Sequence, residues 1–243
     1  MKVSALIPAK GFANAKQRLA PLLDASEREL LAEAMLRDVL SQVLMARGLD
    51  QTFVVTGDAR VSEIAMAAGA EAIRERQERG ETEAVLFALG RMKQKGVKAA
   101  LVVPADLPLL RAADIELLLE PIAGHEPGPF ALLVPSHDRM GTNALLLCPP
   151  DLIALRFGYD SFPYHLSRVA AQGLPLRVLD NENIALDIDE PKDLLEFVAR
   201  VRDSCSQNEH EHDSRARMGE TYARVLELEM IRDSVSASRS GRL

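Results

Sequence analysis

Short apolar runs alternate with amphipathic helical segments along this chain, and this alternation restricts its fold more than any other feature. Predominantly apolar runs lie at residues 3–7, 52–56 and 99–103. A strand that is apolar on both sides is typical of a parallel sheet that is covered by helices on both faces. The sequence therefore predicts an α/β protein with a mostly parallel sheet.

The second half of the chain is less regular. Two apolar runs there flank a hydrophilic stretch, as the strands of a hairpin do, so we expect a mixed sheet with an inserted substrate lobe. Further strands are predicted at residues 70–73, 130–135, 144–148 and 174–179. Helices are predicted at residues 25–47, 61–68, 84–95, 112–120, 161–172 and 190–202, with a loop at 74–83.

The composition changes near Ser204, where charged and small polar residues become dominant. We predict one folded α/β domain over residues 1–203 and a polar tail over residues 204–243. One stripe of the tail could form an amphipathic helix that packs on the domain or on another subunit, or the tail could lack a function. The stripe consists of Met218, Tyr222, Val225, Leu228 and Ile231.

Charge and composition exclude several classes of protein. The formal net charge is −7, whereas a general nucleic-acid binder shows a broad basic field, so we expect no nucleic-acid partner. No apolar run approaches the roughly 20 residues that cross a bilayer, and the amino terminus lacks a signal-peptide layout. The two cysteines form no disulfide or zinc pattern, so we expect a cytoplasmic protein without a membrane partner.

The loop after the first predicted strand carries three cations, Lys10, Lys16 and Arg18, together with Gly11. In a parallel sheet, ligands bind at loops that leave the carboxyl ends of strands. Clustered cations and small residues in such a loop suit a polyanion, above all a nucleoside triphosphate. The alternative is a basic loop that is merely solvated.

Acidic side chains follow two other predicted strands. Asp106 lies just beyond the apolar run 99–103, where a carboxylate can bind a divalent cation or a ribose hydroxyl. Asp187 and Asp189 alternate along an extended segment, so they share a face and require a cation or donors opposite. We expect the three carboxylates to bind Mg²⁺, although Asp106 could cap a helix and Asp189 could cap the helix that begins at Pro191.

Two further segments resemble an anion site. Thr142 lies in a Gly-Thr-Asn turn before an apolar run, and Gly158 and Ser161 come just before a predicted helix. Backbone N–H groups at a helix start and nearby hydroxyls commonly bind phosphate or carboxylate. Each segment could equally be an ordinary turn or cap, and His165, one helical turn after Ser161, could be a buried structural residue or a catalytic one.

These segments, in this order, make the chain similar to a known family. It resembles the 2-phospho-L-lactate guanylyltransferases and bacterial phosphoenolpyruvate guanylyltransferases of coenzyme F-420 biosynthesis. The resemblance implies a Rossmann-like nucleotidyltransferase fold, shared with the molybdenum-cofactor guanylyltransferases. The matching segments are IPAKGFANAKQRL at 7–19, SERELLAEAMLRDVL at 26–40, PADLPL at 104–109, GTNAL at 141–145, FGYDSFPYH at 157–165 and LDIDEPKDL at 186–194.

The resemblance implies the transfer of GMP from GTP to the phosphate of 2-phospho-L-lactate, phosphoenolpyruvate or 3-phosphoglycerate, with release of diphosphate. It also implies Mg²⁺ as cofactor and a homodimer. Lys10, Lys16 and Arg18 would then bind the triphosphate, with Lys16, Arg18 and Asp106 as the catalytic residues. Thr142, Gly158 and Ser161 would bind the acid, while Asp106, Asp187 and Asp189 would bind the metal.

One segment departs from the family. A Gly-Leu-Asn sequence is usual near the nucleobase, whereas this chain has Gly80 followed by Glu81, Thr82 and Glu83. Guanine presents N–H donors, so Gly80 and one of the two glutamates, Glu81 or Glu83, remain candidates for nucleotide binding. CTP or ATP as donor, a molybdopterin or sugar phosphate as acceptor, and a non-catalytic nucleotide-binding regulator remain alternatives. The pair Asp106 and Asp187 favours an enzyme over a regulator.

Overall fold

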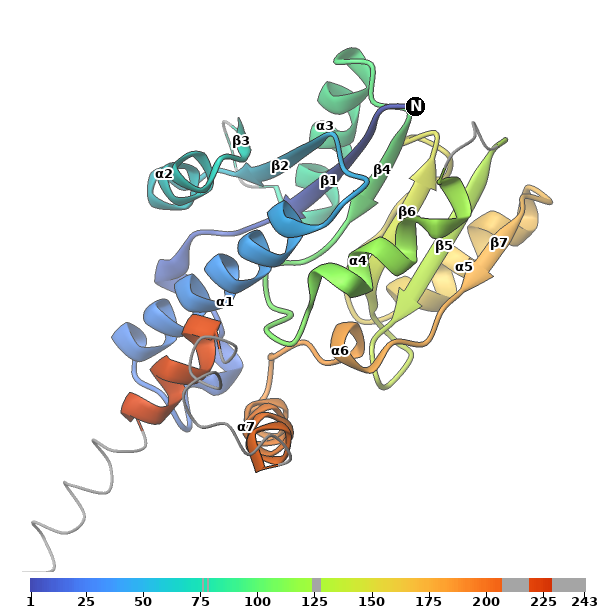
Figure 1. Ribbon diagram of the computed structural model, residues 1–243. Helices are drawn as coiled ribbons and strands as arrows, with labels where there is room; N and C mark the ends of the chain where they lie inside the picture. Colours follow the sequence, from blue (N-terminus) through green and yellow to red (C-terminus); the bar gives the residue numbers. More distant parts are fainter. Residues whose placement is uncertain (76, 78, 124–127, 207–218, 229–243) are drawn as a thin grey trace, which may run out of the picture.

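A seven-stranded sheet forms the centre of the computed structural model, in the order β3-β2-β1-β4-β6-β5-β7 (Figure 1). Among the described strands, only β6 runs antiparallel to its neighbours β4 and β5. The predicted α/β, mixed and mostly parallel sheet is confirmed. The strands are β1 (Val3–Pro8), β2 (Gln51–Thr56), β3 (Glu71–Arg74), β4 (Ala99–Val102), β5 (Phe130–Pro135), β6 (Thr142–Cys148) and β7 (Leu176–Val178). The structure describes residues 1–75, 77, 79–123, 128–206 and 219–228.

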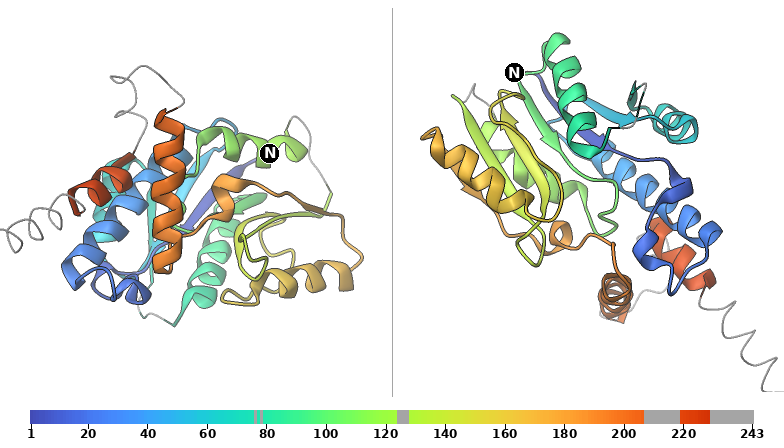
Figure 2. Two further views of the ribbon diagram at one scale, coloured as in Figure 1. Left: turned by 90° about the horizontal axis from the view of Figure 1, so that it is seen from below. Right: turned by 180° about the vertical axis from the view of Figure 1, so that it is seen from behind.

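Helices cover both faces of this sheet, as the two opposite views show (Figures 1 and 2). Alternate side chains of β1 explain this arrangement: Ala5 and Ile7 pack with the first group of helices, and Leu6 packs with the second. The first group is α1 (Ala25–Met45), α2 (Ala59–Ala68) and α4 (Ala112–Leu119), and the second is α3 (Glu81–Gln94) and α5 (Ser161–Ala171).

A third apolar cluster lies outside the sheet, between α1, α7 (Pro191–Ser206) and a helix at residues 219–228. Tyr222, Val225 and Leu228 from the predicted stripe are buried in it, so this part of the tail packs on its own chain. Met218 and Ile231 of the same stripe lie outside the described residues. The homodimer stays a prediction, as does the domain boundary near residue 203.

Local sequence signals account for several helix ends. Asp24 and Glu27 form the expected capping box, in which each side chain accepts a hydrogen bond from the other residue's backbone N–H. Gly69 ends α2 with a φ of 100°, a left-handed conformation that glycine adopts readily. Asp193 accepts from the backbone N–H groups of Asp189 and Glu190 just before α7, whereas the Asp189 side chain, considered as a cap, accepts from Lys16.

The prediction of a loop over residues 74–83 was wrong at its carboxyl end, because α3 begins at Glu81. Gly80 has a φ of 98°, and this left-handed residue turns the chain into the helix three residues earlier than the apolar pattern indicated. Short structures without an apolar period were also missed: the 3₁₀ turns Phe12–Asn14 and Gln17–Leu19 and the helix α6 (Glu182–Ala185). No helix in the described part of the chain combines the length and apolarity needed to cross a membrane.

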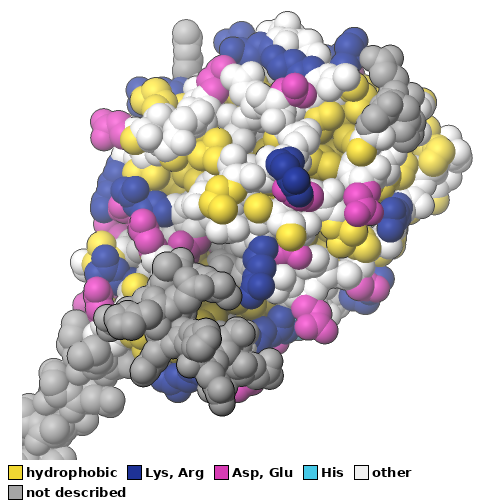
Figure 3. Space-filling model, in the orientation of Figure 1, with side chains coloured by type: hydrophobic (Ala, Val, Ile, Leu, Met, Phe, Trp, Pro, Cys, Tyr) yellow, Lys and Arg dark blue, Asp and Glu magenta, His cyan; other side chains and the backbone are white. Residues whose placement is uncertain are grey.

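The antiparallel direction of β6 determines which of its residues lie at the carboxyl edge of the parallel strands. Val102 near the end of β4 pairs with Leu145, so Thr142 and Asn143 at the start of β6 lie at the carboxyl edge of the parallel strands. The loops after β1 and β4 leave the sheet at this same edge. On the face in front of α1 and α4, positive and negative side chains are interspersed among apolar ones (Figure 3).

Candidate active site

Two cavities open at the carboxyl edge of the parallel strands. The larger has a volume of about 620 Å³ and is lined by residues 8–18 of the cationic loop, with side chains that follow β2, β3 and β4. The smaller, of about 260 Å³, is lined by the turn at 136–143, the segment 157–161 and the acidic segment around Asp187. We call them the large cavity and the small cavity. The first volume is in the range of sites that hold a small organic ligand.

The two cavities share a wall of mostly charged side chains. Arg18, Glu81, Pro104, Asp106 and Asp189 line both cavities. Molecules bound in the two cavities would therefore meet at these residues. Arg18, Asp106 and Asp189 were predicted as site residues, and Glu81 was one of the two glutamates considered for nucleotide binding.

Lys16 connects the cationic loop with the carboxylates of this wall. Its Nζ donates to Asp106 Oδ2 at 2.6 Å and to Asp189 Oδ1 at 2.8 Å, and only 11% of its side chain is exposed. Burial opposes its charge, but the two carboxylates outweigh that effect and raise the pKa of Lys16 above its usual value. Lys16 is thus a fixed cation, held in a left-handed conformation with a φ of 50°.

Two of the three predicted acids, Asp106 and Asp189, belong to this wall, and the third, Asp187, lines the small cavity alone. Asp106 and Asp189 are joined through Lys16, and Asp187 accepts from Asn143 Nδ2 at 3.0 Å. Burial, and next to it the charge of Asp106, raises the pKa of Asp187 to about 6. Asp106 Oδ1 is buried without a hydrogen-bond partner.

These features determine whether the carboxylates can bind a metal ion. Within the described residues, no three acidic, histidine or cysteine side chains are already arranged as a metal-binding group. The ammonium of Lys16 lies between two of the predicted ligands instead. The Oδ1 atom of Asp106 is nevertheless buried without a partner, and carboxylate oxygens are the ligands that hard cations prefer, so the donor set fits a cation such as Mg²⁺.

The predicted anion-site residues come together in the small cavity. The backbone N–H of Thr142 donates to Ser161 Oγ at 2.9 Å, and both side chains are buried at the cavity wall. Gly158, with a φ of 122°, forms the turn before α5, and its carbonyl accepts from the Ser161 N–H. Arg18 is the cation from the first loop that reaches this cavity.

His165 lies behind Thr142. Its ring is fully buried, its Nδ1 is 3.0 Å from Thr142 Oγ1, and its Nε2 accepts from the backbone N–H of Arg156 at 3.2 Å. Burial, with a smaller contribution from the Arg156 guanidinium, lowers the pKa of His165 to about 4. The ring is neutral at physiological pH, whereas the sequence alone left its role open.

The segment that begins at Gly80, predicted to lie near the nucleobase, brings only one of its two candidate glutamates to the cavities. Glu83 is exposed and lines neither cavity, whereas Glu81 lines both and lies 3.7 Å from Lys10. The helical start at Glu81 explains the difference, because Glu81 and Glu83 then point in different directions. Gly80 and Lys10 line the large cavity as expected.

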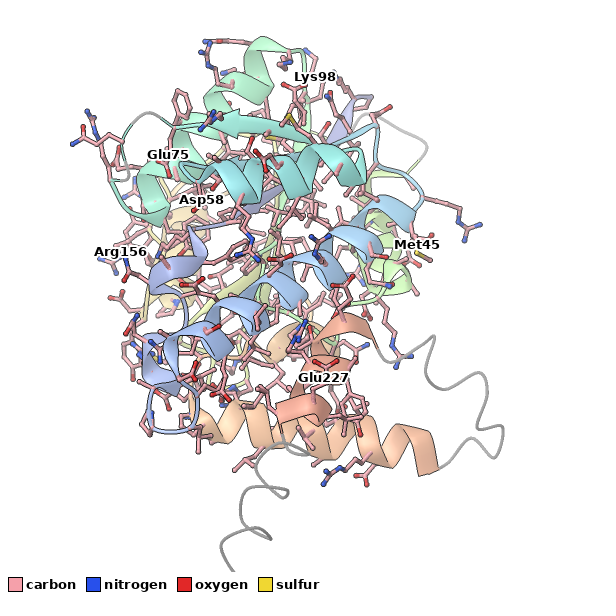
Figure 4. All side chains as sticks on the ribbon, turned by 90° about the vertical axis from the view of Figure 1, so that its left-hand side faces the viewer. Met45, Asp58, Glu75, Lys98, Arg156 and Glu227 are labelled. Atoms are coloured by element: carbon pink, nitrogen blue, oxygen red, sulfur yellow. The ribbon has the colours of Figure 1, made fainter. Side chains whose placement is uncertain are left out.

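Two carboxylates of the large cavity were missed. Asp58 and Glu75 follow β2 and β3 and lie at the same end of the molecule, opposite Met45 and Lys98 (Figure 4). The rule that identified Asp106 could have found them, because each follows a predicted strand at its carboxyl end. Asp58 also caps α2 by accepting from the Val61 N–H.

Comparison with known proteins places the chain in a family. The family model described as guanylyl transferase CofC-like matches residues 3–212. The phosphoenolpyruvate guanylyltransferase of Rubrobacter xylanophilus is 40% identical over 82% of this chain and 95% of its own length. The 2-phospho-L-lactate guanylyltransferase of Methanothermobacter thermautotrophicus is 34% identical, over 82% and 85%. The 3-phospho-D-glycerate guanylyltransferase of Phenylobacterium zucineum is also 34% identical, over 81% and 89%.

Solved structures support the fold alone. A cytidylyltransferase from Leptospira borgpetersenii superposes with a TM-score of 0.56 at 17% identity, covering 97% of this chain and 96% of that one. The expected Rossmann-like nucleotidyltransferase fold is therefore confirmed. The family match over residues 3–212 and the relatives above 30% identity lead to one conclusion: the chain belongs to the guanylyl transferase CofC-like family.

Proposed function

We propose that this protein is a guanylyltransferase that moves GMP from GTP to the phosphate of a small phosphorylated carboxylic acid and releases diphosphate. One observation carries the proposal: two cavities of different size share a wall that contains Arg18, Asp106 and Asp189. A nucleotide in one cavity and an acid in the other would bring their phosphates together there. Family membership supports the same reaction.

The large cavity is the proposed site of GTP. Lys10, Lys16 and Arg18 lie along one side of it, where they can bind the triphosphate. Asp58 and Glu81 line the same cavity and offer carboxylate acceptors for the N–H donors of guanine. Glu81 replaces Glu83 in this role, because Glu83 lines neither cavity.

The small cavity is the proposed site of the acid. Thr142 and Ser161 present hydroxyl groups there, next to the turn at Gly158, and Arg18 supplies a positive charge. These groups can bind a phosphate or a carboxylate. The three relatives are named for three different acids, and phosphoenolpyruvate is the first to test because the relative at 40% identity is named for it.

We propose Mg²⁺ as the cofactor. Asp106, Asp187 and Asp189 would hold it, and the unpartnered Oδ1 of Asp106 supports this choice. A bound Mg²⁺ supplies charge neutralisation between the two phosphates and at the leaving group.

The proposed reaction needs no covalent enzyme intermediate. An oxygen of the acceptor phosphate forms a bond to the α-phosphorus of GTP, and the bond from that phosphorus to the α,β-bridging oxygen breaks as diphosphate leaves. A phosphate monoester is ionised at neutral pH, so a general base is unnecessary, in keeping with a neutral and buried His165. The residues of the two cavities align the acceptor phosphate with the triphosphate. Lys16 and Arg18 stabilise the negative charge that develops on the phosphates during the transfer.

Product analysis tests this proposal. The protein is incubated with Mg²⁺, with GTP, CTP or ATP, and with each of the three acids in turn. We expect diphosphate release and a guanylylated acid detected by mass spectrometry, with GTP as the preferred donor. The proposal would be overturned if no combination of nucleotide and acid released diphosphate. Nucleotide binding with the same affinity in the presence and absence of Mg²⁺ would favour a non-catalytic regulator.

Asp106→Asn provides the matched variant. It keeps the size of the side chain but removes a charge that contacts Lys16 and that is proposed to bind Mg²⁺. We expect at least a hundredfold loss in kcat, and a weaker stabilisation of the protein by Mg²⁺ in thermal unfolding. An Asp106→Asn variant with normal activity would remove the proposed metal site.

A further inference from the structure

A chain of hydrogen bonds leads from the backbone of Arg156 through His165 to the wall of the small cavity. The Arg156 N–H faces His165 Nε2 at 3.2 Å, and His165 Nδ1 faces Thr142 Oγ1 at 3.0 Å. The imidazole is fully buried and packs edge-on against Phe157 and Tyr164. Its two nitrogens therefore meet fixed protein groups rather than water.

The backbone N–H of Arg156 determines which atom donates and which accepts in each of these hydrogen bonds. An N–H group only donates, so His165 Nε2 must be the unprotonated, accepting nitrogen. The proton of the neutral ring is then on Nδ1, which donates to Thr142 Oγ1. A doubly protonated ring would set two donors against each other at Arg156, and burial beside the Arg156 guanidinium also opposes the imidazolium.

The Thr142 hydroxyl is consequently left with a proton to donate. Its oxygen already accepts from His165, and no other partner of this hydroxyl is found in the described part of the chain. Ser161 is in a similar position, because its Oγ accepts from the Thr142 N–H. Both hydroxyls are buried at the wall of the small cavity, so an anion in that cavity is the acceptor that they lack.

We infer that His165 is a positioning residue that orients the Thr142 hydroxyl as a donor to the bound acid. This inference rests on the proposed function, because it assigns the anion of the small cavity as the acceptor substrate. His165 itself touches no substrate and transfers no proton. It decides which way the hydroxyl of Thr142 points.

Three variants separate this role from simple filling of the core. His165→Phe keeps an apolar ring of similar size but loses the donor. His165→Asn places an amide N–H close to the position of Nδ1. Tyr164→Phe is the matched control, because it removes a hydroxyl from a ring that packs on His165 but does not belong to the hydrogen-bond chain. Circular dichroism and thermal unfolding show whether each variant folds.

We expect His165→Phe to raise the KM and the Kd for phosphoenolpyruvate at least tenfold, with the KM for GTP changed less than twofold. His165→Asn should recover most of the affinity for the acid, and Tyr164→Phe should resemble the wild type. Thr142→Val should lose about as much affinity as His165→Phe, and the double variant should lose no more, because one residue acts through the other. Additive losses, or normal acid binding by a folded His165→Phe protein, would overturn the inference.

Nitrogen-15 NMR of the substrate-free protein measures the tautomer directly. We expect the proton of His165 on Nδ1, and a proton on Nε2 would contradict the inference whatever the activity. The proposed function fails on a different result, namely when the wild type binds none of the acids and transfers no GMP. The two outcomes are therefore distinguishable.

Discussion

The ammonium of Lys16 contacts carboxylates from two distant parts of the chain, Asp106 after β4 and Asp189 before α7. Replacing it with methionine keeps most of the length of the side chain but leaves two carboxylates without their cation, and it removes a proposed ligand of the triphosphate. We expect Lys16→Met to lower kcat/KM at least a hundredfold in steady-state kinetics. Lys10→Met should cost less, because Lys10 is 70% exposed and its Nζ lies 3.7 Å from Glu81. Equal losses would contradict the special place given to Lys16.

The raised pKa of Asp187 makes the stability of the folded protein depend on pH. Its pKa is about 6 in the folded protein and near 4 in an unfolded chain, so the folded state binds the extra proton between these values. The free energy of unfolding should therefore fall as pH rises from 4 to 6, and the cost of about 3 kcal/mol should persist at neutral pH.

Asp187→Asn removes this titration. Its amide oxygen can still accept from Asn143, so the substitution keeps the contact and deletes the charge. We expect the metal-free variant to be more stable than the wild type at pH 7.5 by about 3 kcal/mol in urea unfolding, with a smaller difference at pH 4.5. A variant that is less stable at neutral pH would show that Asp187 is not a strained carboxylate.

Single residues at strand ends were the easiest part of the site to predict. Asp106 and the cationic loop follow apolar strands, and the topology of a parallel sheet brings such positions together. The link between His165 and Thr142 could not be predicted, because its direction depends on the backbone of Arg156 in an irregular segment. Sequence patterns specify which residues lie near an edge but not which nitrogen of a histidine meets a donor.

At the scale of the elements, the start of α3 controls which glutamate reaches the cavities. Gly80 has a φ of 98°, and among the described residues outside its two chain neighbours no atom lies within 4 Å of a Cβ added there, so a substitution causes backbone strain rather than a clash. We expect Gly80→Ala to lower stability by about 1 kcal/mol and to weaken GTP binding severalfold, because relief of the strain shifts Glu81.

Gly90 in the same helix is the matched control. A Cβ added at Gly90 would also meet no described residue within 4 Å beyond its chain neighbours and its own helix backbone, but the φ of Gly90 is not in the left-handed region. Gly90→Ala should therefore be neutral or slightly stabilising in thermal unfolding, with unchanged GTP binding. Similar effects of the two substitutions would argue against a strained turn at Gly80.

Elements with a strong apolar period were predicted well, and short or polar elements were not. The helix α1 has a capping box and a continuous buried stripe, so its position followed from the sequence. The helix α6 spans four residues and has no period to detect. The start of α3 was misplaced because Glu81 and Thr82 contribute no apolar signal, while the deciding feature was the φ angle of Gly80.

At the scale of the whole molecule, the reversed direction of β6 joins two binding regions. A parallel strand in that position would begin at the opposite edge and carry Thr142 away from Asp106. Because β6 is antiparallel, its start lies beside the end of β4, and the residues proposed for acid binding meet those proposed for the nucleotide. Local sequence patterns indicated a hairpin, but only the pairing with β4 showed where its turn would lie.

The third apolar cluster supports this arrangement from outside the sheet. Leu19 follows the cationic loop and Leu186 precedes Asp187, and both pack in the cluster that Tyr222 closes. Asp38 of α1 accepts hydrogen bonds from the backbone of residues 220 and 221 and so fixes the start of the closing helix. The helix at 219–228 thus braces the two segments that carry Lys16 and Asp187, although it contributes no residue to either cavity.

Tyr222→Ala tests this brace. Tyr222 is buried and packs edge-on against Phe197, with ring centroids 6.3 Å apart, so the substitution should cost about 3 kcal/mol of stability. We also expect faster hydrogen exchange in residues 16–23 and 186–190, unchanged exchange in α3 and α5, and a higher KM for both substrates. Arg224→Ala is the control on the same helix, because Arg224 contacts Glu227 at the surface and should affect none of these. If exchange rose evenly over the whole domain, the helix would contribute general stability and would not brace the site.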